Sequence, residues 1–189
     1  MNIVCASSVL HAAEAFSGLG DVRLLPDRDI RREHLLGADA LIVRSKTSVG
    51  PELLDGTPVG FVATATAGAD HFDVPWLNQA DIAWSAAPGC NANSVAEYVA
   101  AALALLARKR AALLPGQTLG IVGVGQVGSR VAQKAEILGL RVLRNDPPLA
   151  LQTGSADFRP LEAVLCEADM LTLHVPLVAD GPLPTRHLA

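Results

Sequence analysis

Short apolar runs alternate along the whole chain with longer stretches whose apolar residues recur at helical spacing. The short runs are rich in Val, Ile, Leu and Ala, and those at 40–43 and 118–122 contain no charged residue. Strands that are buried on both faces of a parallel sheet have this composition. The alternation therefore predicts an α/β protein that is built from β-α-β units.

The first part of the chain predicts five strands with short helices between them. We expect strands at 3–5, 22–25, 40–43, 60–65 and 82–85, and helices at 9–17, 51–54 and 74–79. Pro88–Gly89 then breaks the pattern. These elements predict an N-terminal domain over residues 1–94.

A long apolar helix follows at 95–112, with Ser94 as its N-cap and Glu97 completing a capping box. It is apolar on all sides, so we expect burial between two domains or against a second copy of the chain. Pro115–Gly116 ends this linking segment, 95–115. Residues 116–189 then predict strands at 118–122, 141–144 and 170–174, with helices at 126–138 and 161–166. This β-α-β-α-β pattern is one half of a Rossmann domain.

The composition of the chain argues against several classes of function. The net charge of -4 with 15 Lys+Arg argues against nucleic acid as a partner, and the basic clusters at 31–32 and 108–110 are expected at helix ends. Three widely spaced cysteines show no metal-ligand spacing, so we expect a reduced chain without metal, located in the cytoplasm. We expect neither a signal peptide nor a membrane span, since the longest apolar run is shorter than about 18 residues.

The segment LGIVGVGQVGSRV places Gly123, Gly125 and Gly128 in G-x-G-x-x-G spacing between a strand and a helix. Gly123 is expected to make the tight turn, Gly125 to let backbone approach a pyrophosphate, and Gly128 to let the helix pack against the strand. The backbone amides of Gln126 and Val127 would then face an anion at the helix N-terminus. The alternative is a plain turn without a ligand.

Asp146 ends the next strand, close to the distance of about 20 residues at which Rossmann domains carry a ribose-binding carboxylate. A carboxylate there accepts hydrogen bonds from ribose hydroxyls and repels a 2′-phosphate. The sequence therefore predicts NAD in preference to NADP. Two nearby cations, Arg141 and Arg144, leave NADP open.

Three further blocks, VRSKT at 43–47, ATATAGADHFD at 63–73 and SAAPGCNANSVAEYV at 85–99, resemble the D-2-hydroxyacid dehydrogenases. The APGCNA block and the paired prolines after Asp146 favour the member that oxidises 4-phosphoerythronate over phosphoglycerate dehydrogenase. The resemblance implies a flavodoxin-like substrate lobe before the Rossmann half, a phosphorylated 2-hydroxy acid as substrate, NAD as cofactor and a cytoplasmic homodimer in vitamin B6 synthesis.

The resemblance also assigns site residues. Ser45 and Thr66 match substrate-contacting hydroxyls, which are suited to donate to a phosphate or carboxylate oxygen; the alternative is that they bond local backbone. Gln126, Val127 and Asp146 match cofactor positions, and so does Val175, where the family usually has Thr. We expect structural roles for the two histidines of these blocks, at 71 and 174.

No catalytic residue is predicted within the chain. The family's Arg and its Glu–His pair match positions beyond residue 189, so we expect the chain alone to be inactive and poorly stable, with strand 118–122 as an unpaired edge. A second class of function remains open, in which the chain is a non-catalytic NAD-binding or dimerising module. The substrate-contacting hydroxyls of Ser45 and Thr66 favour the enzyme, because such a module does not need them.

Overall fold

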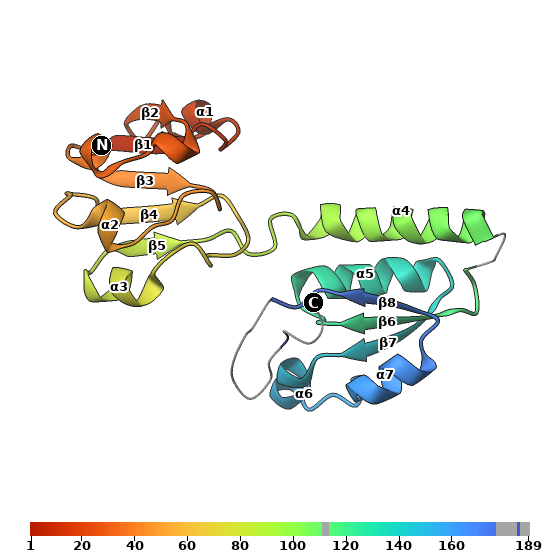
Figure 1. The fold of residues 1–189 in the computed structure, drawn as a ribbon. Helices are drawn as coiled ribbons and strands as arrows, with labels where there is room; N and C mark the ends of the chain where they lie inside the picture. Colours follow the sequence, from red (N-terminus) through yellow and green to blue (C-terminus); the bar gives the residue numbers. More distant parts are fainter. Residues whose placement is uncertain (111–113, 177–184, 186–189) are drawn as a thin grey trace. The chain divides into compact units, whose positions relative to one another are not determined.

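The computed structural model describes residues 1–110, 114–176 and 185 (Figure 1). The chain divides into two compact units, Met1–Cys90 and Asn91–Ala189. The sequence suggested divisions after residues 94 and 115, with a separate linking helix between them. That helix instead belongs to the second unit, because its buried side chains share a core with the second sheet.

The first unit is a five-stranded parallel sheet with short helices. The strands are β1 Asn2–Ala6, β2 Asp21–Leu25, β3 Ala40–Val43, β4 Phe61–Thr64 and β5 Ala83–Ser85. The helices are α1 Ala12–Phe16, η1 Asp27–Asp29, η2 Arg32–Leu35, α2 Pro51–Leu54 and α3 Val74–Gln79, where η marks a 3-10 helix. The strand order β2-β1-β3-β4-β5 is that of flavodoxin-like sheets, which confirms the expected fold.

The core of this unit lies on both faces of the sheet. All four residues of β3 are buried, as their uninterrupted apolar character predicts. Leu41 and Val43 belong to the larger cluster, whereas Ala40 and Ile42 belong to a smaller one. The helix expected at 9–17 begins only at Ala12, because His11 has a left-handed φ of 58° that does not continue a helix.

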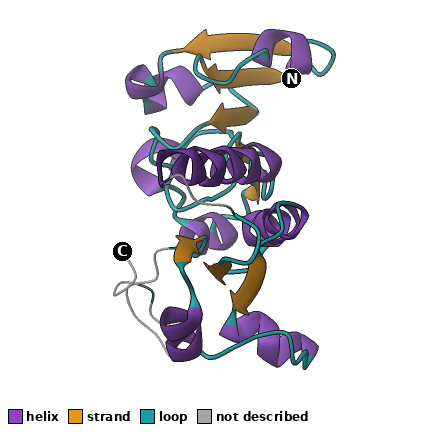
Figure 2. Ribbon diagram, turned by 90° about the vertical axis from the view of Figure 1, so that its right-hand side faces the viewer, coloured by secondary structure: helices purple, strands orange, loops and turns teal. Residues whose placement is uncertain are grey.

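The second unit contains α4 Ala92–Arg110, β6 Thr118–Val122, α5 Gln126–Ile137, β7 Arg141–Asn145, α6 Pro147–Thr153, α7 Leu161–Glu167 and β8 Met170–Leu173. Both helices and strands make up this unit, as they do the first (Figure 2). The sequence pattern did not predict α6.

Helix α4 differs from its expectation in two ways. It begins at Ala92, so Ser94 lies inside the helix and forms no capping box; Asn93 instead donates from Nδ2 to Glu97 Oε1 at 2.8 Å. One face alone is buried within the chain, where Leu103 packs in the core with α5, whereas Tyr98 is 75% exposed. Residues 111–112 of the expected helix lie outside the described residues.

Strand β6 is central, and the expectation that it forms an unpaired edge is wrong. The sheet order is β7-β6-β8, all parallel, and a single bridge joins Arg144 of β7 to Phe158. In a Rossmann sheet the third strand lies beside the second, and the fourth lies beside the first. Phe158 bridges to β7, the second strand, and β8 pairs with β6, the first strand, so β8 is the fourth. Sequence order alone had suggested that β8 was the third.

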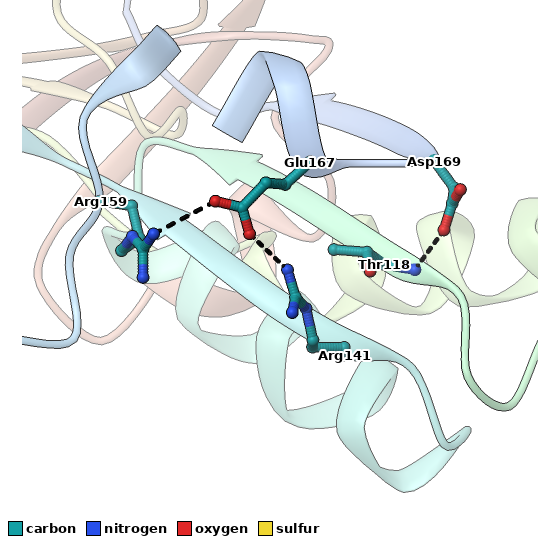
Figure 3. Close-up of polar contacts among 5 residues, drawn as sticks. All are labelled: Thr118, Arg141, Arg159, Glu167 and Asp169. Atoms are coloured by element: carbon teal, nitrogen blue, oxygen red, sulfur yellow. Dashed lines mark hydrogen bonds and ion pairs between the residues drawn. The ribbon is translucent and has the colours of Figure 1, made fainter. Parts of the chain in front are cut away.

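Polar contacts fix β8 and α7 to the sheet edge opposite the glycine turn (Figure 3). Asp169 accepts from the backbone N–H of Thr118 through Oδ2 at 2.8 Å, which aligns the start of β8 with the start of β6. Glu167 pairs with Arg141 at 2.6 Å and with Arg159 at 3.2 Å. These contacts tie the end of α7 to β7 and to the segment between α6 and α7.

None of the helices in the described ranges combines the length and apolar character that crossing a membrane requires.

Candidate dinucleotide and substrate sites

The glycine turn lies between β6 and α5, as its spacing predicts. Gly123 has a φ of +85°, a backbone conformation that residues other than glycine rarely adopt. A Cβ on Gly128 would lie 2.0 Å from the carbonyl oxygen of Gly123, so this glycine lets α5 approach the strand. A Cβ on Gly125 would meet nothing within 4 Å. The space on the Cβ side of Gly125 is therefore open.

The N-terminus of α5 provides donors to that space. Gly125 is the residue before the helix, and Gln126 and Val127 are its first two residues. Backbone N–H groups of the first helical turn have no partner inside the helix, and the helix dipole favours an anion there. The turn therefore has the shape and the donors that a diphosphate requires.

Asp146 lies directly beside this turn. Its Oδ2 accepts from the backbone N–H of Val124 at 2.8 Å, and its Oδ1 accepts from Leu149 N at 3.1 Å as the N-cap of α6. A carboxylate has about four acceptor positions, so each oxygen retains capacity for a further hydrogen bond. Sequence spacing found Asp146 but gave no signal for Val124, whose amide orients it.

The two arginines of β7 are each held by a carboxylate. Arg144 pairs with Glu136 of α5, and Arg141 pairs with Glu167 of α7. Both guanidinium groups therefore face helices that cover the sheet. Asp146 instead bonds to the glycine turn itself, and Arg130 of α5 donates to Gln126 Oε1 at 2.9 Å.

Val175 and the glycine turn come together. An added Cβ on Gly123 would lie 2.7 Å from Val175 Cγ1 and 2.7 Å from the carbonyl oxygen of His174. The segments that follow β6 and β8 thus meet at the carboxyl ends of these strands, where the strand order reverses and open α/β sheets bind ligands.

His174 is oriented by the same strand. Its Nε2 lies 3.0 Å from Thr172 Oγ1, and its backbone N–H donates to Val122 O at 2.8 Å. Burial lowers the pKa of this imidazole, because it disfavours the charged form. The hydrogen bonds of His174 and the lowered pKa agree with the structural role expected from the sequence.

Ser45 and Thr66 follow β3 and β4, two adjacent parallel strands, so both lie at the carboxyl edge of the first sheet. Ser45 is exposed, and its hydroxyl has no partner among the described residues. Thr66 is half-buried, and its hydroxyl donates to Gly68 O at 2.9 Å. The alternative that these hydroxyls bond local backbone therefore holds for Thr66 but not for Ser45.

A chain of hydrogen bonds fixes the direction of the Thr66 hydroxyl. Thr66 Oγ1 lies 2.7 Å from Thr64 Oγ1, which lies 3.0 Å from His71 Nε2. Because Thr66 gives its proton to Gly68, Thr64 donates to Thr66 and His71 donates to Thr64. In this arrangement Thr66 offers an acceptor rather than the donor that the sequence suggested.

This direction of donation requires a proton on Nε2 of His71. Burial lowers the pKa of its imidazole, against the opposing effect of Asp70. The ring also packs edge-on against Phe72 with ring centroids 4.7 Å apart. Sequence spacing could not reveal that His71 orients the Thr66 hydroxyl through Thr64, because Thr64 lies inside a buried strand and belongs to no motif.

No group of three or more His, Cys, Asp or Glu side chains in the described ranges could hold a metal ion.

Residues 8–171 match the family model of the D-isomer specific 2-hydroxyacid dehydrogenase catalytic domain. The chain belongs to the D-2-hydroxyacid dehydrogenase family. Two curated relatives, the erythronate-4-phosphate dehydrogenases of Salmonella paratyphi B and Salmonella newport, are each 52% identical to it. These matches include 100% of this chain and 50% of each relative, so the chain spans about half the length of the curated relatives it matches.

Several solved structures share the fold. The NAD+-bound 3-phosphoglycerate dehydrogenase of Entamoeba histolytica is 27% identical, with a TM-score of 0.75 over 94% of this chain and 63% of its own. The TT0316 protein of Thermus thermophilus has a TM-score of 0.81 at 24% identity, over 94% of this chain and 66% of its own. The D-lactate dehydrogenase of Aquifex aeolicus, complexed with NAD and lactic acid, has a TM-score of 0.76 at 23% identity, over 93% of this chain and 61% of its own.

Proposed function

We propose that the chain supplies the substrate lobe and the dinucleotide-binding part of an NAD-dependent erythronate-4-phosphate dehydrogenase. The 52% identity to such enzymes over the whole chain carries this proposal. The reaction would convert 4-phospho-D-erythronate to its 2-oxo acid in pyridoxal 5′-phosphate synthesis. We further propose that the protein acts in the cytoplasm as a homodimer.

The residues of the second unit fit NAD. The open space beside Gly125 would admit the diphosphate, and the amides of Gln126 and Val127 would donate to it. The free acceptor capacity of Asp146 would receive the ribose hydroxyls, and its charge would disfavour a 2′-phosphate. Val175 would border the cofactor through its backbone and apolar side chain. When bound, NAD supplies the hydride acceptor.

In the first unit, Ser45 and Thr66 would contact the substrate. The unpartnered Ser45 hydroxyl can donate to an anionic oxygen. Thr66 would instead accept a hydrogen bond from a substrate hydroxyl, since its own proton is used by Gly68. A polyhydroxy acid presents both kinds of group.

The base and the carboxylate-binding cation would come from the half of the relatives that this chain does not match. We therefore propose that the 189-residue chain is inactive alone. The test compares it with a longer protein that continues into the second half, using NADH formation from 4-phospho-D-erythronate and calorimetric titration with NAD. We expect NAD binding by both and turnover only by the longer protein.

Turnover by the 189-residue chain would overturn the assignment of catalysis to the half of the relatives that this chain does not match. Turnover of 3-phosphoglycerate in place of 4-phospho-D-erythronate by the longer protein would overturn the substrate. NAD binding without any dehydrogenase activity in the longer protein would instead favour the non-catalytic module.

A further inference from the structure

A cavity of about 370 Å³ lies at the carboxyl edge of the first sheet. Residues that follow β2 and β3 line it, together with the start of α2. Its volume corresponds to roughly a dozen water molecules at about 30 Å³ each and lies within the range of small-ligand sites. The cavity belongs entirely to the first unit.

Cations outnumber carboxylates around this cavity. Its charged lining residues are Arg28, Arg31, Arg32 and Lys46, against Asp27 and Glu52. One of the carboxylates is already engaged, because Asp27 Oδ1 accepts from Ser8 Oγ at 2.6 Å. The lining therefore favours an anion.

Two of the cations are held in place by backbone carbonyls. Arg31 donates from Nη1 to Ile30 O at 3.1 Å, and Arg32 donates from Nη2 to the carbonyls of Pro51 at 3.0 Å and Glu52 at 3.1 Å. A guanidinium has five N–H donors, so both retain donors for a ligand. Fixing them beforehand lowers the entropy lost when an anion binds.

The other two cations have no partner of their own. The side chains of Arg28 and Lys46 form no hydrogen bond or ion pair with any residue in the described ranges. Lys46 directly follows Ser45, so the loop after β3 presents a hydroxyl and an ammonium at successive positions.

We propose that this cavity binds the phosphate group of the substrate while Ser45 contacts the sugar-acid portion. The inference rests on the proposed function and adds to it the site that recognises the phosphorylated end. A phosphate suits this lining because guanidinium groups bind its oxygens through paired N–H donors and lysine adds a point charge.

The first test is calorimetric titration of the 189-residue chain with inorganic phosphate. We expect binding that weakens as salt is raised, and at least a tenfold weaker affinity in the double variant Arg28→Gln, Lys46→Gln. Arg23→Gln is the matched control, because Arg23 lies on β2 outside the cavity and should leave the affinity unchanged. Circular dichroism establishes that each variant is folded, and the single variant Lys46→Gln replaces the double one if that fails to fold.

The second test identifies the source of the phosphate. We expect 4-phospho-D-erythronate to displace inorganic phosphate from the cavity, and erythronate without the phosphate to bind at least tenfold more weakly. Equal affinity of the two sugar acids, or undiminished phosphate binding in the cavity variants, would overturn the proposal. NAD titration and turnover by the longer protein decide the proposed function separately, since neither measurement involves the cavity variants.

Discussion

The carboxylate of Asp146 accepts a hydrogen bond from the backbone N–H of Val124 across 2.8 Å. This contact joins the end of β7 to the glycine turn that follows β6. The residue proposed to bind the ribose is thereby fixed relative to the amides proposed to bind the diphosphate. The two parts of the proposed cofactor site are thus positioned before any ligand arrives.

Replacement of Asp146 by Asn should weaken NAD binding about tenfold or more, since a hydrogen bond to a charged group contributes about 1.5–3 kcal/mol. It should also reduce the preference for NAD over NADP, because the charge that repels a 2′-phosphate is gone. Calorimetric titration with both dinucleotides measures each effect. Asp157→Asn, at an exposed position, is the control. An unchanged ratio of the two affinities would contradict the assigned role.

Two glycines of the same turn should separate stability from binding. In Gly128→Ala the new methyl group meets the carbonyl oxygen of Gly123, so we expect a loss of about 1–3 kcal/mol or more in the free energy of unfolding. In Gly125→Ala the methyl group meets no protein atom, so stability should be unchanged while NAD affinity falls. Urea denaturation and NAD titration distinguish the two variants. Equal destabilisation by both would refute the division of roles.

The pH dependence of stability should reflect His174. Burial lowers its pKa below the ordinary value of 6.5, so between these two pKa values the unfolded chain binds a proton that the folded chain does not. The free energy of unfolding should therefore fall as pH drops below about 6.5. His174→Gln should make this fall shallower between pH 7 and pH 5.5, as measured by urea denaturation. Between pH 7.5 and pH 8.5, where the imidazole is neutral in both states, variant and wild type should show the same pH dependence.

The three cysteines should differ in reactivity. Cys5 is completely buried, and its pKa is raised to about 11, chiefly by burial and secondarily by the charge of Asp27. Cys90 and Cys166 are exposed. A thiol reagent at pH 8 should label two thiols quickly and the third only as the chain unfolds. A variant that retains only Cys5, with Ser at 90 and 166, should label slowly until urea is added; rapid labelling in its absence would show that β1 is not buried as described.

The sequence by itself determined most of the elements and the order in which they occur. Apolar runs such as 40–43 and 118–122 predicted their strands because strands buried on both faces must be apolar throughout. The glycine spacing predicted the turn at 123–128, because a left-handed φ and a close helix–strand approach each exclude a side chain. Helix α6 escaped prediction because it is short and has no buried residue.

Only the tertiary structure decided which strands are neighbours and which polar groups meet. Strand order depends on long-range pairing, so β8 is found beside β6 although it follows β7 in the chain. The same pairing brings Val175 to Gly123, and packing at the carboxyl edge of the first sheet connects His71 to Thr66 through Thr64. A hydroxyl can donate or accept, so the role of Thr66 depends on neighbours that chain folding alone places around it.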